Sequence, residues 1–282
     1  MDTETGKLYI CATPIGNLKD MTERVRETLS EVDLIAAEDT RNSLKILNHF
    51  GIKTPMTSYH EHNKYEKAEE LISKLLSGLN IAVITDAGTP CISDPGEVLV
   101  KRCIEEGITV TSLPGPSAVI TALTLSGLST RHFYFEGFLP AVKQKKEREE
   151  ELSLLSQLTV TMVLYEAPHR LKETLTDLAK VLGEDRRISL CRELTKVHEE
   201  IIRTTIGEAA LLEPRGEYVL VIEGRSKEEV KREQEKAFEE MTIEEHVNLY
   251  INKGMDKKEA MKAAAKDRGL SKRDIYNALI GL

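Results

Sequence analysis

One stretch of the chain decides the fold class: residues 81–96, which run IAVITDAGTPCISDPG. It opens with four apolar residues, and a short apolar run bounded by turn residues is typical of a buried strand. A segment with two glycines and two prolines follows, and the amphipathic residues 97–104 then begin a helix. Asp94, directly before Pro95, is expected to cap that helix. The stretch therefore predicts a strand, a rigid loop and a helix, with Asp86 at the carboxyl end of the strand.

This loop is a candidate ligand site, because ligands of open α/β sheets bind outside the carboxyl ends of the strands. Gly88 and Gly96 permit positive φ or a close approach of the backbone, and Pro90 and Pro95 fix φ. The alternative is an ordinary connection from a strand to a helix. We favour a ligand site, since a loop with so many fixed dihedral angles holds its backbone groups in place.

The first part of the chain, residues 1–128, alternates short apolar runs with amphipathic ones. Besides the central strand, we expect strands at residues 7–12, 32–37, 55–59 and 109–113. Helical patterns separate these runs, which is typical of a mostly parallel sheet with helices on both faces. We predict an N-terminal α/β domain with five parallel strands.

Residues 129–225 are expected to form a second α/β domain. A charged helix is predicted over residues 143–155, and later strands at 160–165, 188–192, 201–205 and 218–223. These strands follow too closely for a helical crossover between each pair, so the second sheet is predicted to be mixed. From residue 226 to 282 the composition shifts to charged helix, and we predict a C-terminal helical module with one basic face.

The composition narrows the class of protein. The chain has 282 residues, 40% of them hydrophobic and 30% charged, and no apolar run approaches the length of a membrane span. We expect no signal peptide and no membrane partner. The four cysteines are scattered, as free thiols of a reducing compartment would be, which indicates the cytoplasm. The net charge of −8 argues against bulk electrostatic binding to nucleic acid but leaves room for a local basic patch.

Common catalytic signatures are missing from the sequence. It contains no P-loop, no G-x-G-x-x-G after the first strand and no G-x-S-x-G elbow. His60 and His62 could suggest a metal, but without a nearby third ligand we interpret them as polar surface, and we expect no metal.

What remains is a set of loops at predicted strand ends. The simplest geometry places them around a cleft between the two domains. Loops of glycine, proline and small residues suit a flat, neutral or cationic ligand, and acids such as Asp86 suit an ammonium group or ribose hydroxyls. The loops are residues 13–18, 38–41, 86–96, 114–118, 166–170 and 193–200.

These loops closely resemble those of the tetrapyrrole methylase superfamily of S-adenosylmethionine-dependent methyltransferases. Within it, they look like the bacterial enzymes that methylate a cytidine 2′-oxygen of 16S ribosomal RNA. Each match alone is weak, but together they cover most of residues 7–224 in order and spacing. The matching segments are residues 13–18, 36–41, 58–63, 85–96, 114–118, 165–170, 192–200 and 216–224. The C-terminal module resembles a helical tail found on many members, although the shortest members lack it.

The resemblance implies two α/β domains with the methyl donor in the cleft between them, and a homodimer. It implies methyl transfer to the ribose 2′-oxygen of a decoding-centre cytidine of 16S rRNA, on the assembled small ribosomal subunit, with S-adenosylhomocysteine as the other product. By position, the donor site would comprise Pro14, Ile15, Gly16, Asp86, Ala87, Gly88, Thr89, Pro90, Ser117, Ala118, Glu166, Ala167 and Pro168.

A ribose hydroxyl is a poor nucleophile, so a nearby base or strong acceptor should assist the transfer. The candidates are Glu38, Asp39, Glu166, His169, Glu193 and Glu199. Of these, we predict Glu166 or Asp39 as the base. Basic side chains would hold phosphates or orient these acids; they are Arg41, Arg170, Arg192 and Lys196. For any one of these pairs, a salt bridge that only shapes the cleft is the alternative.

RNA binding by an acidic chain requires local basic patches. We predict one near the cleft rim, at Lys143, Lys145, Lys146 and Arg148. A second is predicted on the C-terminal module, at Lys262, Lys266 and Arg268. The alternative for the module is a solvated helical surface.

Two rival functions stay open. An enzyme acting on a small tetrapyrrole would need no basic tail, and a change in a porphyrin precursor would support it. An RNA-binding assembly factor that kept a donor pocket would bind the donor without turnover. The intact rigid loops count against the second rival.

Overall fold

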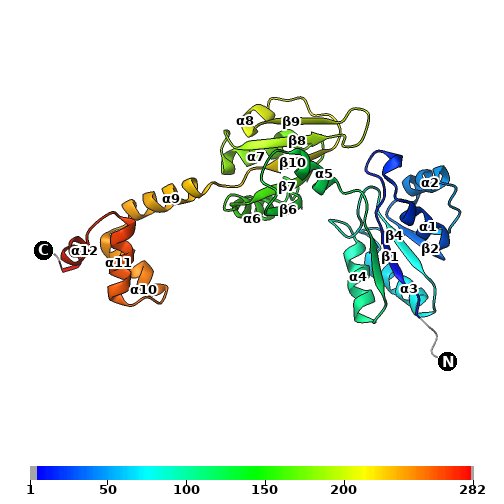
Figure 1. Cartoon of the computed structure of the whole chain (residues 1–282), viewed down its shortest axis with the longest axis horizontal. Helices are drawn as coiled ribbons and strands as arrows, with labels where there is room; N and C mark the ends of the chain where they lie inside the picture. The colour runs from blue at the N-terminus through cyan, green and yellow to red at the C-terminus, as the bar shows by residue number, and fades with distance from the viewer. Residues whose placement is uncertain (1–4, 281–282) are drawn as a thin grey trace. The chain divides into compact units, whose positions relative to one another are not determined.

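The computed structural model describes residues 5–280, without the side chains of residues 234, 235 and 239. The chain divides into two compact units, one up to Glu223 and one from Gly224. We call them the α/β unit and the C-terminal helical unit. Both sheets lie in the α/β unit (Figure 1). The predicted boundary near residue 128 stays a prediction.

The first sheet has five strands in the order β3-β2-β4-β1-β5. Every neighbouring pair is parallel, which confirms the prediction from the alternating pattern. The central stretch supplies β4, which lies between β1 and β2. The strands are β1 (Leu8–Cys11), β2 (Leu34–Ala37), β3 (Met56–Ser58), β4 (Ile81–Ile84) and β5 (Val110–Leu113).

Helices cover both faces of this sheet, because alternate strand residues point to opposite sides. Ile81 and Val83 pack with α3 (Lys64–Leu76) and α4 (Gly96–Glu105), whereas Ala82 and Ile84 pack with α1 (Glu23–Glu31) and α2 (Thr40–His49). The short 3-10 turn η1 (Leu18–Asp20) precedes α1. Each helix contributes an apolar stripe, such as Leu71, Ile72 and Leu75 of α3.

Some helices begin at positions that differ from the predicted ones. The Asp39 carboxylate accepts a hydrogen bond from the Arg41 N–H and so caps α2, which begins at Thr40. Asp94 accepts from the Gly96 N–H at 2.8 Å, but Pro95 is the residue at the helix boundary. The predicted helix over residues 143–155 begins only at Lys145.

The second sheet has the order β6-β7-β10-β8-β9 and is mixed, as predicted. β6 (Phe133–Phe138) runs parallel to β7 (Thr161–Glu166), while the other neighbours are antiparallel. Its remaining strands are β8 (Arg187–Arg192), β9 (Glu200–Thr205) and β10 (Tyr218–Ile222). One face packs on α6 (Lys145–Leu155), α7 (Leu171–Leu182) and α8 (Ile206–Ala209).

Helix α5 (Ala118–Leu125) links the two sheets. It follows β5 of the first sheet, yet its buried residues Val119, Ala122 and Leu123 pack on the second sheet, against Val163 and Val219 among others. The loop before α5 is therefore held between the two sheets.

The C-terminal helical unit consists of α9 (Lys227–Glu240), α10 (Ile243–Asn252), α11 (Lys257–Asp267) and α12 (Lys272–Ile280). Ser226 and Thr242 begin α9 and α10 with capping boxes. Val247, Met261 and Ile275 belong to a small core between α10, α11 and α12. Within residues 5–280, no helix combines the length and the apolar character needed to cross a membrane.

Candidate functional site

The loops after β1 and β4 are joined by backbone hydrogen bonds. The N–H of Thr13 donates to the Gly88 carbonyl at 2.9 Å, and the N–H of Gly88 donates back at 3.0 Å. Gly88 adopts φ of 85°, which favours glycine. The Thr13 hydroxyl also donates to the carbonyl of Thr85. The Thr89 hydroxyl extends the network by donating to the Pro116 carbonyl at 3.0 Å. Three strand ends of the first sheet thus carry one continuous, rigid platform.

The acids of this platform are fixed by the chain itself. The Thr85 hydroxyl donates to Glu38 at 2.6 Å. Asp86 accepts from the Asp39 N–H at 3.2 Å and from the Asn42 side chain at 3.3 Å. The carboxylates of Glu38 and Asp86 therefore have defined positions before any ligand binds.

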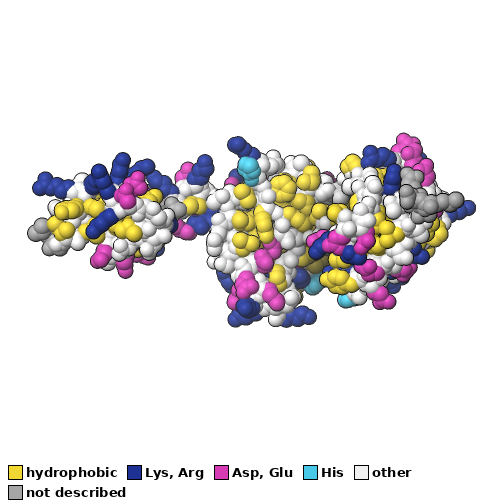
Figure 2. All heavy atoms as spheres, turned by 90° about the horizontal axis from the view of Figure 1, so that it is seen from below, with side chains coloured by type: hydrophobic (Ala, Val, Ile, Leu, Met, Phe, Trp, Pro, Cys, Tyr) yellow, Lys and Arg dark blue, Asp and Glu magenta, His cyan; other side chains and the backbone are white. Residues whose placement is uncertain are grey.

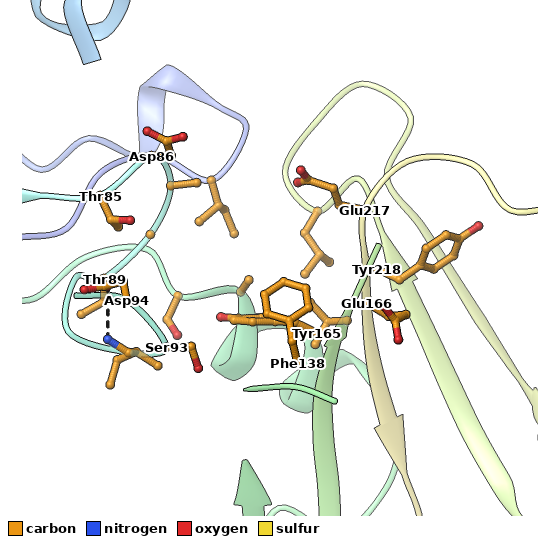
Figure 3. A pocket seen from close by; sticks show the side chains of 18 of the residues that line it. Thr85, Asp86, Thr89, Ser93, Asp94, Phe138, Tyr165, Glu166, Glu217 and Tyr218 are labelled. Carbon is orange, nitrogen blue, oxygen red and sulfur yellow. Dashed lines mark hydrogen bonds between the residues drawn. The ribbon is translucent and has the colours of Figure 1, made fainter. Parts of the chain in front are cut away.

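A cavity of about 350 Å³ lies between this platform and the second sheet. Figure 3 shows Asp86 and Thr89 on one side, and Glu166, Glu217 and Tyr218 on the other. The predicted cleft between the strand-end loops is therefore present in the structure.

Nine of the thirteen predicted donor residues line the cavity. They are Ile15, Asp86, Ala87, Gly88, Thr89, Ser117, Ala118, Glu166 and Ala167. The other four, Pro14, Gly16, Pro90 and Pro168, are not part of its wall. Gly16 lies instead against the loop after β8. A Cβ atom there would be 2.5 Å from Cγ of Lys196 and 2.9 Å from the Leu194 carbonyl oxygen. The β1 loop and the loop after β8 thus touch at Gly16, where only glycine fits.

Of the acids and basic residues predicted to take part in catalysis, Glu38, Glu166, Glu193 and Lys196 line the cavity. The others are not part of its wall: Asp39, Arg41, His169, Arg170, Arg192 and Glu199. Glu193 accepts hydrogen bonds at Oε1 from the Lys196 ammonium, at 3.3 Å, and from the Glu217 N–H, at 3.4 Å. Its Oε2 atom has no hydrogen-bond partner among the described residues. Glu193 therefore keeps one carboxylate oxygen available as a proton acceptor in the cavity wall.

The geometry argues against Asp39 and Glu166, the two acids predicted from the sequence to act as the base. Hydrogen bonds from the Arg41 side chain and N–H lower the pKa of Asp39 to about 2, so this carboxylate is a weak base. Glu166 is 2% exposed, and both of its oxygens are bonded. They accept from the Ala167 N–H at 2.8 Å and from the Thr174 hydroxyl at 2.5 Å, and Arg170 Nε lies 3.4 Å away.

One predicted phosphate contact is wrong. Arg148 is only 3% exposed, so it cannot meet a phosphate from the cleft rim. Its guanidinium donates to Asp177 at 3.0 Å, to Thr174 at 3.0 Å and to the Pro140 carbonyl at 2.7 Å. The sequence marked Arg148 as one of a charged cluster, but its position in α6 turns it toward α7.

The other predicted RNA contacts differ in availability. Lys143 is exposed, and Lys145 and Lys146 are exposed and form long ion pairs with α6 acids at 3.8 Å. Lys262 and Lys266 are also exposed. Figure 2 shows Lys and Arg side chains gathered along one edge of the C-terminal helical unit. By contrast, Arg268 is engaged within that unit.

Arg268 donates to His246 Nδ1 at 3.0 Å and to the carbonyl of Met241 at 2.6 Å. Its guanidinium therefore has a structural role in the helical unit. The exposed lysines of the helical unit are therefore better candidates for RNA contacts than Arg268.

Several cavity residues were not predicted, chiefly those of the second sheet. Phe138 and Tyr165 contribute an aromatic wall, with ring centroids 5.4 Å apart. Glu217 and Tyr218 reach the site from the start of the antiparallel β10. The remaining unpredicted members are Thr85, Ile92, Ser93, Asp94, Cys191, Leu194 and Val219. A signal for Tyr165 existed, since it directly precedes Glu166, whereas the direction of β10 could not be inferred from sequence.

The cavity is strongly acidic. Six acidic residues line it, against one basic residue, Lys196. The acidic residues are Glu38, Asp86, Asp94, Glu166, Glu193 and Glu217. Opposite charges attract strongly where water is partly excluded, so the cavity favours a cationic ligand. Among the described residues, no group of three or more His, Cys, Asp or Glu side chains is placed to hold a metal ion.

Strained backbone is concentrated in two loops of the cavity. Cys91 and Ser93 in one loop, and Glu193 and Thr195 in the other, have φ between 51° and 69°. Residues other than glycine rarely adopt this region, and such strain gathers at ligand sites. The two loops face the cavity from opposite sheets, through Ser93 and Glu193.

Comparison with known proteins gives the family. The family model described as Tetrapyrrole (Corrin/Porphyrin) Methylases matches residues 7–210. The chain therefore belongs to the tetrapyrrole methylase family, and it is an enzyme of the methyltransferase class. A solved structure, that of diphthine synthase, has the same fold, with a TM-score of 0.61 at 13% identity over 78% of this chain and 91% of that chain.

Much closer relatives exist in sequence. Ribosomal RNA small subunit methyltransferase I of Bacillus subtilis (strain 168) is 50% identical over 280 residues, which are 98% of this chain and 94% of that protein. The protein of the same name from Halalkalibacterium halodurans is 49% identical over 278 residues, 97% of this chain and 94% of that protein. The likeness thus extends through both the α/β unit and the C-terminal helical unit.

Proposed function

We propose that this chain transfers a methyl group from S-adenosylmethionine to the ribose 2′-oxygen of a decoding-centre cytidine in 16S rRNA of the small ribosomal subunit. The observation that carries the proposal is the 50% identity, over nearly the whole chain, to a relative named ribosomal RNA small subunit methyltransferase I. The choice of the cytidine 2′-oxygen rests on the resemblance of the strand-end loops.

The cavity suits the methyl donor on physical grounds. S-adenosylmethionine, when bound, supplies a methyl group on a positively charged sulfur. The acid-rich wall complements a sulfonium and an ammonium group. Ser117 and Ala118, at the N-terminal end of α5, line the same cavity, and a helix N-terminus suits a carboxylate. We therefore assign the donor to this cavity, with Asp86, Gly88 and Ala118 among the residues that hold it.

The chain's own contribution to the reaction is mainly positional. The platform formed by the loops after β1, β4 and β5 is fixed by hydrogen bonds and would hold the reacting groups in line. Glu193 would accept the proton of the ribose hydroxyl at Oε2, while Lys196 and the Glu217 N–H hold its Oε1. Arg170 and Thr174 would keep Glu166 in place at the cavity wall.

RNA binding would rely on surfaces outside the cavity, because its carboxylates repel phosphates. We propose that the exposed lysines of α6 and of the C-terminal helical unit contact the RNA backbone. We also propose a homodimer that works in the cytoplasm, and separate folding domains at residues 1–128, 129–225 and 226–282.

A methyl-transfer assay tests the proposal. Purified protein and labelled S-adenosylmethionine are incubated with small subunits from cells that lack this protein, with naked 16S rRNA and with a porphyrin precursor. Label in the RNA of small subunits is the expected result. Label only in the porphyrin precursor would contradict the proposal and indicate an enzyme that methylates a small tetrapyrrole. Donor binding without label in any substrate would indicate the assembly factor.

A further inference from the structure

The aromatic side chain of Phe138 has an unusual setting for a large apolar residue. It lines the cavity, yet 53% of it is exposed. Tyr165 lies behind it, and Phe135 in turn packs edge-on against Tyr165 at 5.1 Å. In Figure 3 the rings of Phe138 and Tyr165 lie beside each other, between the loop that carries Thr89 and the strand that carries Glu166. The cavity therefore has one flat, apolar and partly open wall.

A β-bulge places Phe138 on this wall. Phe135 pairs with Val163, but Gly137 pairs with Leu164 and Phe138 with Tyr165, so Glu136 is an extra residue in β6. Without the bulge, Phe138 would pair with Glu166 and its side chain would point to the other face of the sheet. That face is the core beneath α6 and α7, where Leu164 and Leu175 pack. The bulge thus moves an aromatic ring out of the core and into the cavity.

The bulge is held by two independent contacts. Gly137 has φ of 78°, and a Cβ atom there would lie 2.7 Å from the Ser93 hydroxyl oxygen, so the strained loop after β4 packs directly on the bulge. On the other side, Arg170 donates to the Leu139 carbonyl at 2.5 Å, and Arg148 donates to the Pro140 carbonyl at 2.7 Å. Two arginines therefore fix the backbone directly after Phe138.

We propose that Phe138, supported by Tyr165, is a stacking platform for a nucleobase. Single-stranded RNA is commonly recognised by stacking of an exposed base on an aromatic side chain. The half-open position of Phe138 favours the base of the acceptor nucleotide, which arrives from solvent on a large RNA, over the adenine of the donor. The inference rests on the proposed function and adds a base-binding subsite to it.

The test compares substitutions at Phe138. Phe138→Ala removes the ring, Phe138→Leu keeps an apolar side chain without a π face, and Phe138→Tyr keeps the ring. The matched control is Phe133→Ala, at the start of the same strand, where the side chain is 41% exposed and outside the cavity wall. Each variant is assayed for KM with small subunits, for kcat, for the Kd of S-adenosylhomocysteine by calorimetry, and for its thermal midpoint.

We expect Phe138→Ala and Phe138→Leu to raise KM for small subunits by roughly 5- to 150-fold, the range for loss of one base–aromatic stack. Phe138→Tyr and Phe133→Ala should stay close to wild type, as should the Kd of S-adenosylhomocysteine in all four variants. A raised Kd for S-adenosylhomocysteine with unchanged KM would place the donor adenine on the platform instead. Unchanged values of both in Phe138→Ala would overturn the platform itself.

Failure of the proposed function has a different signature. Wild-type protein that binds S-adenosylhomocysteine but labels no RNA would remove the proposed reaction and, with it, the acceptor base. If the wild-type protein methylates small subunits and Phe138→Ala does so equally well, only the proposed base-binding subsite is contradicted.

Discussion

At the residue scale, Glu193 is the acid on which the proposed chemistry most depends. Its carboxylate lines the cavity and keeps Oε2 available, while Lys196 and the backbone hold Oε1. Glu193→Gln removes the proton acceptor with little change of shape. We expect kcat for small subunits to fall by about 10²- to 10⁴-fold, the usual contribution of a general base.

The matched control for this prediction is Asp39→Asn. Asp39 pairs with Arg41 outside the cavity wall and has a pKa of about 2, so its removal should change kcat much less. Single-turnover transfer from labelled donor measures both variants, and S-adenosylhomocysteine binding checks that their cavities are intact. Equal losses of kcat in the two variants would contradict the role of Glu193.

Single residues also show how far the sequence could predict the site. The loops that carry Asp86, Gly88 and Ala118 could be placed at one edge because they follow parallel strands, whose carboxyl ends must meet there. Their expected role as donor contacts came from the family resemblance. Phe138 could not, because the bulge at Gly137 reverses the side on which its ring lies. Arg148 was misjudged because a charged helix gives no sign of the one basic residue that it buries.

At the scale of elements, the contact between the β1 loop and the loop after β8 should be intolerant of added volume. A Cβ atom at Gly16 would meet Leu194 and Lys196 at 2.9 Å or less. Gly16→Ala should therefore force the two loops apart, lower the free energy of unfolding by about 1–3 kcal/mol and weaken donor binding. Chemical denaturation and calorimetry with S-adenosylhomocysteine measure the two effects.

Gly51→Ala is a suitable control for Gly16→Ala. Gly51 has φ of 69° but open space around it, and it is not part of the cavity wall. It should cost stability through backbone strain without changing donor affinity. Donor affinity that is unchanged in Gly16→Ala as well would show that the loop contact does not shape the cavity.

The C-terminal helical unit should respond to pH through His246. This side chain is fully buried between Phe238 and Tyr250, accepts from Arg268 and lies 3.4 Å from Asp267. Burial, followed by the Arg268 charge, lowers the pKa of His246 below its ordinary value of 6.5. The unfolded unit therefore binds a proton more readily than the folded one near pH 6.

The sign of the effect follows from that difference. The free energy of unfolding of this unit should be at its maximum above about pH 6.5 and fall as the pH drops below it. Hydrogen exchange of α10 and α11 in the intact protein, corrected for intrinsic rates, should show weaker protection at pH 5 than at pH 7.5. His246→Gln does not titrate, so an equal pH dependence in that variant would contradict the role of His246.

At the scale of elements, the sequence predicted the architecture well. Every strand of the first sheet was expected near its observed place, because each is a short apolar run between helical patterns. The mixed second sheet followed from strand spacing alone. The packing of α5 on the second sheet was not predictable, because its small apolar residues would fit either sheet.

At the scale of the whole molecule, net charge and RNA binding are reconciled by separate surfaces. Lys258, Lys262 and Lys266 are exposed at four-residue spacing, so they share one face of α11. Lys262→Glu with Lys266→Glu should raise KM for small subunits, reduce the salt dependence of binding and leave donor binding intact.

The control for charge is Lys53→Glu with Lys101→Glu. Both lysines are exposed on the α/β unit, outside the cavity wall, and the pair changes the net charge of the chain equally. Filter binding of small subunits at several salt concentrations measures both double variants. A loss of affinity that is the same in the two would indicate a general charge effect and contradict a basic docking face on α11.

The central claim is methylation of one ribose in the small subunit, and mapping the product in RNA tests it most directly. 16S rRNA from cells with and without this protein is cleaved by alkali, which spares the bond after a 2′-O-methylated ribose, and the fragments are sequenced. The account predicts one resistant position, at a decoding-centre cytidine, that disappears without the protein and returns when purified enzyme and S-adenosylmethionine are added to small subunits. Identical cleavage patterns in the two RNAs would contradict it.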